Sequence, residues 1–269
     1  MRPPVALTVA GTDSGGGAGI AADLKTFAAH GVWGTCAVTA VTAQNTALVG
    51  QIQLLGPAMV TAQIGAVVSD IGVSAAKTGM LGSGRIVQAV VAAVVEWGLG
   101  PLVVDPVAVS TSGSKLATPG GLAAIRGELL PVADLVTPNL PEAAALAEWP
   151  EPPADRAGME RLAFDVLDLG PAAVLLTGGH LPGAEAPDVL VTREGGAQPR
   201  WLTGPRLDSR TTHGTGCVLS AAVTARLARR ETLVQAVEGA KQFVTAAIAA
   251  GVDLGRGPGA VNPSGPCPP

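Results

Sequence analysis

Aromatic and charged residues are scarce in this chain. Tyrosine is absent, phenylalanine occurs three times, and Asp, Glu, Lys and Arg together make up 14% of the 269 residues, against 48% for hydrophobic residues. The core must therefore be built mainly from Ala, Val, Leu and Ile. The composition does not change sharply along the sequence, so we expect one large domain over residues 1–262. The Gly- and Pro-containing tail that follows, residues 263–269, is expected to be disordered.

A continuous block of basic residues is also missing. The 17 basic and 21 acidic residues leave a net charge of -4, and no cluster of Lys and Arg could neutralise a row of phosphates, so nucleic acid is not an expected partner. The apolar residues 5–10 are too few for a signal segment and are soon followed by Asp13. Residues 26–69 carry no Asp, Glu, Lys or Arg, but His30 and Gln44 are among the polar residues that keep them short of about 18 consecutive apolar residues, so no membrane span is expected.

Cysteine is rare as well. Cys36, Cys217 and Cys267 are widely separated, odd in number, and lack the spacing of metal ligands. This pattern favours free thiols in a reducing compartment. We therefore predict a cytoplasmic protein.

Short apolar runs rich in valine alternate with Ala-rich helical stretches along most of the chain. Such strands are typical of a parallel sheet that is covered on both faces, so we predict a doubly wound α/β fold with a mostly parallel sheet. The predicted strands are residues 5–10, 36–42, 75–78, 102–104, 135–137 and 173–176, followed by hairpin-like segments at 189–192 and 198–203. The predicted helices are residues 18–30, 58–69, 84–97, 120–129, 141–148, 156–169, 217–229 and 233–250.

The turn at residues 211–217 is the strongest local signal for chemistry. Gly214 and Gly216 let backbone N–H groups converge at the start of a helix, where unpaired donors and the helix dipole favour an anion. A phosphate cradle is therefore predicted. Cys217, in the first turn of that helix, would have its thiolate stabilised and could accept a proton from a substrate hydroxyl. The alternative is a Gly-rich turn followed by a buried structural cysteine.

A second Gly-rich turn, residues 11–19, follows the first predicted strand and opens a helix. It superficially meets the context of a dinucleotide site. Its glycines could instead let the backbone lie close over a flat ligand, with Asp13 or Asp23 accepting hydrogen bonds from the ligand. A plain tight turn is the alternative.

Polar side chains follow two further strands. Asp105 lies just past a strand end, where open α/β sheets bind ligands, and could orient a metal or polarise a phosphate oxygen. An Asx turn is the alternative for Asp105. Asn139 and Glu142 have the spacing of a helix capping box, a structural role that does not exclude a Mg²⁺ site completed by waters and substrate phosphates.

Two loops complete the candidate set. Gly179 belongs to a pair of glycines after the strand that ends at residue 176, where a nucleotide phosphate could approach. His180 beside it is predicted to be a loop residue. Gln44 could donate to a ring nitrogen and accept from an exocyclic amine, although isolated polar loop residues are ordinarily only solvated.

The ordered set of these motifs resembles the hydroxymethylpyrimidine and phosphomethylpyrimidine kinase family of thiamine biosynthesis, a branch of the ribokinase superfamily. The resemblance runs from Ala6 to Asn262. The segments that carry it are A-G-T-D-S-G-G-G-A-G-I-A-A-D-L-K-T-F (10–27), V-T-A-Q-N-T (41–46), A-K-T-G-M-L (76–81), V-V-D-P-V (103–107), T-P-N-L-P-E-A (137–143), G-G-H-L (178–181) and T-H-G-T-G-C-V-L-S-A-A (212–222).

The resemblance implies a ribokinase-like fold, ATP and Mg²⁺ as cofactors, a homodimer, and phosphorylation of the pyrimidine alcohol and then of its monophosphate. By matched position it implies a catalytic Cys217 in an anion hole with Gly214 and Gly216. The residues implied to line the pyrimidine pocket are Gly11, Asp23, Gln44, Met80 and Val107. Those implied to contact ATP or its phosphates are Asp105, Asn139, Thr177, Gly179 and Thr215, and those implied for the metal are Asp105 and, through water, Glu142.

The sequence also departs from the family pattern. Thr111 and Thr177 stand where the family commonly has lysine, which implies weaker charge stabilisation and a slower rate, or failure of one of the two steps. A pyridoxal kinase is one alternative, against which Gln44 speaks because pyridoxal has no exocyclic amine. A non-catalytic pyrimidine-binding relative is another, although the retained Asp105, Glu142 and Cys217 would then have no function.

Overall fold

The structure of the chain is a computed structural model that describes residues 2–107, 118–194 and 198–265. Its centre is a nine-stranded sheet with the strand order β3-β2-β1-β4-β5-β6-β7-β8-β9. The strands are β1 (Val5–Gly11), β2 (Trp33–Gln44), β3 (Val49–Leu54), β4 (Ala75–Thr78), β5 (Leu102–Val104), β6 (Leu135–Val136), β7 (Ala173–Thr177), β8 (Asp188–Thr192) and β9 (Arg200–Leu202).

The middle of the sheet is parallel and its edges are antiparallel. Strands β2, β1, β4, β5, β6 and β7 are joined by parallel pairings, whereas β3 pairs antiparallel with β2, and β8 and β9 extend the other edge antiparallel. Every residue of β1 is buried, as expected for a strand that is covered on both faces. The predicted doubly wound fold is confirmed.

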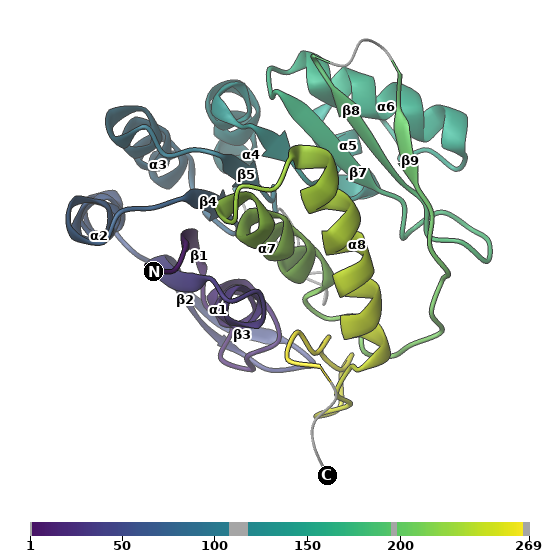
Figure 1. Ribbon diagram of the computed structural model, residues 1–269, viewed down its shortest axis with the longest axis horizontal. Coiled ribbons are helices and arrows are strands. Elements are labelled where there is room, and N and C mark those ends of the chain that lie inside the picture. The colour runs from purple at the N-terminus through teal and green to yellow at the C-terminus, as the bar shows by residue number, and fades with distance from the viewer. Residues whose placement is uncertain (1, 108–117, 195–197, 266–269) are drawn as a thin grey trace.

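Helices cover both faces of this sheet. Those helices are α1 (Gly19–Ala29), α2 (Pro57–Asp70), α3 (Gly84–Trp97), α4 (Pro119–Ala124), α5 (Leu140–Leu146), α6 (Arg156–Asp168), α7 (Thr215–Ala228) and α8 (Leu233–Ala249). Residues of α1, α7 and α8 form one hydrophobic cluster with the sheet, and residues of α2 to α6 form the other. Figure 1 shows α1, α7 and α8 along one side of the sheet and α2, α3 and α4 along the other. Along β1, Ala6 belongs to the first cluster and Leu7 to the second, because neighbouring strand residues face opposite sides.

Two elements differ from those predicted. Strand β3 was not predicted, because its residues are mostly exposed and alternate Gln with Gly and Ile instead of forming a buried apolar run. The helix predicted over residues 120–129 begins as α4 and continues as a π-helical turn (Ile125–Leu129). The chain then tightens into a 3-10 turn (Leu130–Val132) at Pro131, which has no N–H to extend a helix.

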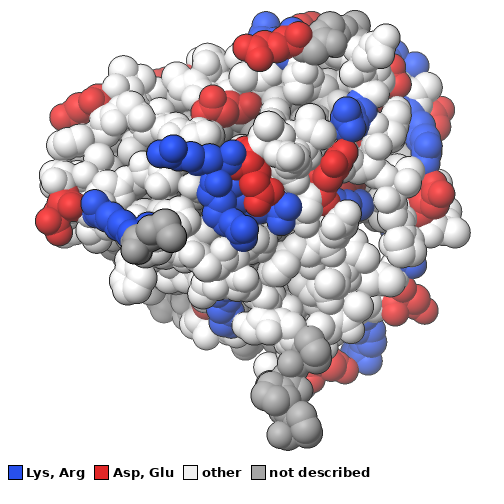
Figure 2. Space-filling view, viewed as in Figure 1, with Lys and Arg blue, Asp and Glu red and all other residues white. Residues whose placement is uncertain are grey.

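Charge is distributed sparsely over the surface. Figure 2 shows Lys and Arg interspersed with Asp and Glu over α7 and α8, and a largely uncharged surface over α1 and the β2–β3 edge. Within the described ranges, no helix has the length and apolar character that crossing a bilayer requires. Thr111 and residues 266–269 of the predicted tail lie outside the described residues.

Candidate active site

The sequence-predicted residues gather at one edge of the sheet, where the parallel strands have their carboxyl ends. Gly11 ends β1 and Gln44 ends β2, while Asp105 directly follows β5. The chain leaves β1 for β2 on one side and returns to β4 on the other, so the strand order reverses between β1 and β4. Open α/β sheets bind ligands outside the carboxyl ends of their strands at such a reversal. Gly11 and Met80 meet there, because a Cβ added to Gly11 would lie 3.1 Å from the Met80 sulfur.

The Gly-rich turn after β1 is organised by one carboxylate. Asp13 Oδ1 accepts the backbone N–H of Gly15 at 2.8 Å, and Asp13 Oδ2 accepts those of Gly17 at 3.1 Å and Ala18 at 2.9 Å. Burial alone would raise the pKa of Asp13, but hydrogen bonds from His213 and from the backbone hold this pKa below its ordinary value. The Asp13 carboxylate therefore shapes the turn, and its bonding capacity is largely used by protein donors rather than by a ligand.

The same carboxylate joins this turn to the predicted phosphate cradle. His213 Nε2 lies 2.9 Å from Asp13 Oδ2. Gly214 has φ of 86°, and a Cβ at Gly214 would clash with the carbonyl oxygen of Gly17. Only glycine fits this close packing without strain. The two Gly-rich turns, one near each end of the chain, therefore form a single unit.

Ser14 connects Gln44 to that unit. The Ser14 hydroxyl accepts the backbone N–H of Gln44 at 2.7 Å and donates to the Gln44 carbonyl at 2.6 Å. Gln44 at the end of β2 and Cys217 in the first turn of α7 are thus linked at one edge of the sheet. The link runs through Ser14, Asp13 and His213.

The first turn of α7 is open to an anion. Gly214 occupies the N-cap position, and among the described residues no side chain caps this helix, unlike α3, which is capped by Ser83. Gly216 is exposed and Thr215 is half-buried. An uncapped helix start of this kind has backbone donors and a dipole end that favour an anion.

Cys217 does not have the stabilised thiolate that its position predicts. Burial, with the negative charge of Asp105, raises the pKa of its thiol to about 12, whereas Lys77 and the backbone N–H of Gly19 act in the opposite direction. Burial of the thiol, together with the negative charges of Asp105 and Asp23, outweighs the effect of the helix start on its pKa. Cys217 is a thiol at neutral pH in this structure.

A buried ion cluster lies beneath Cys217. Lys77 on β4 is 0% exposed, and its Nζ lies 2.8 Å from Asp23 Oδ1 and 4.0 Å from Asp105 Oδ2. Thr8 donates to Asp23 Oδ2 at 2.6 Å, and Ser220 donates to Asp105 Oδ2 at 3.0 Å. Burial would lower the pKa of Lys77, but Asp23, Cys217 and Asp105 raise it above its ordinary value. Lys77 is therefore a buried cation held by two carboxylates.

The contacts of this ion cluster bear on the roles predicted for Asp23 and Asp105. Asp23 was predicted to line the pyrimidine pocket, yet its residue is 0% exposed and its carboxylate is bound by Lys77 and Thr8. Asp105, predicted to contact phosphate or metal, is 4% exposed and is bound by Ser220. Both carboxylates lie beside the Lys77 ammonium, and burial raises the pKa of each.

Asn139 and Glu142 form the predicted capping box at the start of α5. The Asn139 side chain accepts the Glu142 backbone N–H at 2.9 Å, and Glu142 Oε2 accepts the Asn139 N–H at 3.0 Å. Asn139 also forms a β-bridge with Thr177, the last residue of β7, which places these two predicted nucleotide residues side by side. In the described part of the chain, no group of three or more His, Cys, Asp or Glu could hold a metal ion.

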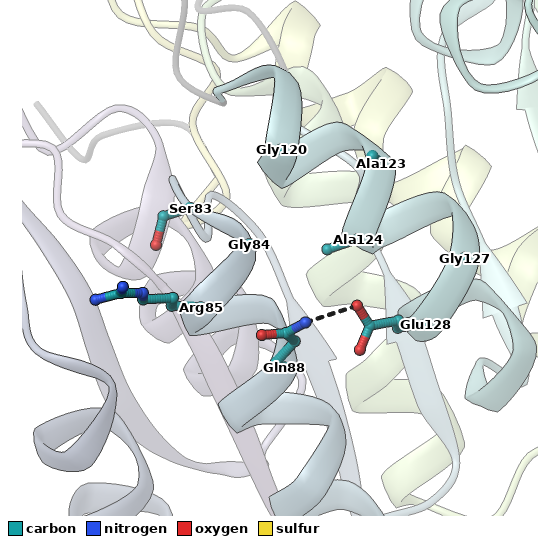
Figure 3. Close-up of a pocket in the computed structure, with 9 residues that line it drawn as sticks. All are labelled: Ser83, Gly84, Arg85, Gln88, Gly120, Ala123, Ala124, Gly127 and Glu128. Carbon is teal, nitrogen blue, oxygen red and sulfur yellow. Dashed lines mark hydrogen bonds between the residues drawn. The ribbon is translucent and has the colours of Figure 1, made fainter.

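A cavity lies elsewhere in the described part of the chain. It has a volume of about 630 Å³ between α3 and α4, and Gln88 Nε2 donates to Glu128 Oε1 across it at 2.9 Å. Figure 3 shows Arg85 and Ser83 on the α3 side and small residues such as Gly127 on the other. None of the site residues predicted from the sequence is among the described residues that line it.

Sequence reasoning missed several residues that shape the site. Ser14 and His213 lay inside quoted motifs but were given no role. Lys77 lay inside the 76–81 motif but was given no partner, and Ser220 and Thr8 were given no role. An isolated lysine inside a short buried strand was the available signal, because a buried ammonium requires a nearby carboxylate.

Comparison with known proteins gives consistent matches. The family model for phosphomethylpyrimidine kinase matches residues 13–262. The hydroxymethylpyrimidine/phosphomethylpyrimidine kinase of Streptomyces coelicolor is 48% identical over 262 residues, which cover 97% of this chain and 95% of that protein. The Escherichia coli protein of the same name is 42% identical over 264 residues, covering 97% and 98%.

Solved structures show the same fold. An ADP complex of Bacillus subtilis pyridoxal kinase has a TM-score of 0.89 and 36% sequence identity, and the match covers 98% of each chain. A phosphomethylpyrimidine kinase from Clostridium difficile has a TM-score of 0.78 and 38% identity, covering 90% of this chain and 97% of that one. The predicted ribokinase-like kinase fold is thereby confirmed.

Proposed function

Because this chain belongs to the phosphomethylpyrimidine kinase family, we propose that it phosphorylates 4-amino-5-hydroxymethyl-2-methylpyrimidine with ATP and then phosphorylates the monophosphate to the diphosphate, in thiamine biosynthesis. The observation that carries this proposal is the union of the two Gly-rich turns through Asp13 and His213. This union joins the turn at residues 11–19, whose Ser14 bonds the backbone of Gln44, to the turn at residues 211–217, which contains Cys217.

In each round an oxygen of the substrate attacks the γ-phosphorus of ATP while the bond from that phosphorus to the β,γ-bridging oxygen breaks and ADP leaves. We propose that the first-turn N–H groups of α7 stabilise the charge that develops on the transferred group. In the first round a proton must also leave the hydroxyl, and Cys217 is the acceptor that we propose. Because burial raises the pKa of its thiol to about 12, Cys217 must first release its own proton to water before it can accept the proton of the hydroxyl, and the positive charge of Lys77 favours that release.

ATP and Mg²⁺ are the cofactors that we propose. Bound with ATP, Mg²⁺ would neutralise charge on the phosphate oxygens, and Glu142 and Asp105 are the carboxylates proposed to contribute to its site. The oxygen donors at this edge of the sheet fit a hard cation. Asn139 and Thr177, which form a β-bridge, are proposed to contact the nucleotide together with Gly179 and Thr215.

The direct experiment supplies the purified protein with ATP, Mg²⁺ and the pyrimidine alcohol and follows the products by chromatography. We expect the monophosphate to appear first and the diphosphate to follow. Failure to form either product would refute the proposal, and tight pyrimidine binding without turnover would identify a non-catalytic relative instead.

Pyridoxal is the second candidate substrate, because pyridoxal kinases are among the structures to which this chain is similar. We propose that the pyrimidine is preferred, since Gln44 can accept a hydrogen bond from its exocyclic amine and pyridoxal has none to offer. Comparing kcat/KM for the two substrates in one preparation decides between them. A higher value for pyridoxal would overturn the assignment.

We also propose that the protein is a cytoplasmic homodimer that pairs through the free edge of β3. Residues 26–69 contain no charged side chain, and Val41 and Ile52 on this edge are 50% and 38% exposed. An uncharged edge strand is a template for pairing with another chain, and an identical copy related by a two-fold axis presents the same surface. Ile52→Lys should halve the mass measured by light scattering, while Val95→Lys on the distant helix α3 should leave the mass unchanged.

A further inference from the structure

One arginine holds the turn between β7 and β8 through backbone carbonyl groups alone. Arg206 Nε donates to the Gly183 carbonyl at 2.8 Å, and Nη1 donates to that of Gly179 at 2.7 Å. Arg206 Nη2 donates to the carbonyls of Leu181 and Glu185, the latter at 3.1 Å. Four carbonyls from a seven-residue stretch (179–185) thus converge on one guanidinium.

This convergence is specific to the shape of arginine. The guanidinium is a planar fork with five N–H donors and no acceptor, so it can bind several carbonyls in fixed directions. A lysine ammonium has three donors at a single point and could not reach four carbonyls spread along the turn. The turn contains no regular helix or strand that would otherwise hold these carbonyls. Backbone pairing with residues 204–206 holds only the end of the turn, through a β-bridge between Glu185 and Pro205. The Arg206 side chain holds the carbonyls of residues 179–183 that precede this bridge.

The base of the turn is fixed independently. Asp188 Oδ1 accepts the Gly178 N–H at 3.1 Å, while Asp188 Oδ2 lies 2.7 Å from Lys241 Nζ on α8. A Cβ at Gly178 would clash with the Pro187 carbonyl oxygen. Gly178 is therefore held against the sheet, and Arg206 sets the path of the chain beyond it.

The turn begins at the nucleotide side of the proposed site. Thr177 ends β7 beside Asn139, and Gly179 is exposed just beyond it. We propose that Arg206 is a positioning residue for the nucleotide: it orders the 179–185 turn so that the exposed backbone at Gly179 is presented to the phosphates of ATP, without itself touching the pyrimidine. This inference rests on the proposed kinase function.

Preordering a binding turn lowers the entropy cost of binding, so its loss should weaken nucleotide affinity more than turnover. We expect Arg206→Ala to raise KM for ATP and the calorimetric Kd for ADP about tenfold, with kcat at saturating ATP and Kd for the pyrimidine changed less than about twofold. Arg206→Lys should recover little of the loss. Millimolar ethylguanidinium should partly restore ADP binding to Arg206→Ala, whereas ethylammonium should not.

Arg156→Ala is the matched control. Arg156 Nη2 lies 2.6 Å from the Glu185 carboxylate on the same turn, but it binds a side chain and both partners are substantially exposed. Its removal should change nucleotide affinity less than about twofold, as expected for an exposed ion pair.

Unchanged ADP affinity in folded Arg206→Ala overturns the inference. So does an equal loss of pyrimidine and ADP binding, since that outcome means a general structural defect. Circular dichroism and thermal melting of the alanine and lysine variants establish which outcome applies. Because ADP binding is measured without turnover, a wild-type protein that binds ADP but phosphorylates no pyrimidine would refute the proposed function and leave the Arg206 test intact.

Discussion

Asp13 in the Gly-rich turn and Asp23 in the helix α1 that follows it are both buried aspartates, yet their carboxylates have different partners. Asp13 accepts neutral backbone N–H groups and contacts His213 at the surface of the site. Asp23 is fully buried and is paired with the Lys77 ammonium. The hydrogen bonds of Asp13 set the path of the backbone, while Asp23 compensates the charge of Lys77 in the interior. Residue type alone therefore does not define the role of an aspartate in this site, because burial and the charge of the nearest partner decide it.

We expect the largest effect from a change at Cys217, which lies beside the buried cluster of Lys77, Asp23 and Asp105. We expect Cys217→Ala to lower kcat by about 10²–10⁴-fold, the usual contribution of a positioned proton acceptor, while changing pyrimidine affinity little. Steady-state kinetics and calorimetry with the pyrimidine measure the two effects. An unchanged kcat would mean that Cys217 only packs against the ion cluster.

Removing the buried cation should be the next largest change. Lys77→Met leaves Asp23 and Asp105 without their cation, and we expect it to lower the free energy of unfolding by about 3–5 kcal/mol. Urea unfolding followed by circular dichroism measures this loss. The double variant Lys77→Met/Asp23→Leu should be more stable than the single variant, because it removes the carboxylate that was left unpaired. Equal stability of both variants would contradict this account of the cluster.

The contribution of the Asp13 carboxylate to the free energy of unfolding should decrease at low pH. The folded-state pKa of Asp13 is lowered from 3.8, so its stabilising effect is complete above that value and is lost as the pH falls through the lower folded-state pKa. Asp13→Asn places an amide among N–H donors and should lower the free energy of unfolding by about 1–3 kcal/mol at pH 7. The difference between the two proteins should shrink below about pH 4, as measured by urea unfolding at several pH values. A difference that stays constant to pH 3 would argue against an ionised Asp13.

The smallest effect should come from the connection to Gln44. Ser14→Ala removes the hydroxyl that bonds both the N–H and the carbonyl of Gln44. Because this hydroxyl is exposed, we expect a loss of about 0.5–1.5 kcal/mol in pyrimidine binding free energy and little change in ADP binding. Thr61→Ala, on α2 away from this edge, is the control. Equal weakening by both variants would show that the Ser14 contact has no special role.

Much of the fold could be predicted because its signals are local. The strands at 75–78 and 102–104 and the helix at 84–97 match β4, β5 and α3 in their bounds, because short runs with apolar residues mark the strands and an apolar stripe marks the helix. The capping box of Asn139 and Glu142 was predictable for the same reason. Strand β3 was not, since its exposed polar residues are held by backbone pairing with β2 rather than by burial.

The partners within the site could be predicted only in part. The parallel topology brings Gly11 and Gln44, at the ends of β1 and β2, to one edge of the sheet, and the contact between Asp13 and His213 brings the turn that precedes Cys217 next to the turn after β1. The pairing of Lys77 with Asp23 joins residues 54 positions apart, and no spacing rule identifies such a contact. The expectation of a stabilised thiolate at Cys217 was wrong for a related reason: it considered the helix start but not the two aspartates that the fold brings to the thiol.

The contact between Asp13 and His213 spans 200 residues of the chain, and this has a consequence for synthesis on the ribosome. A nascent chain can form β1 and its glycine turn early, but the turn lacks its imidazole neighbour until α7 has emerged from the exit tunnel. Premature termination before His213 would therefore release a polypeptide that contains all nine strands and no assembled catalytic centre.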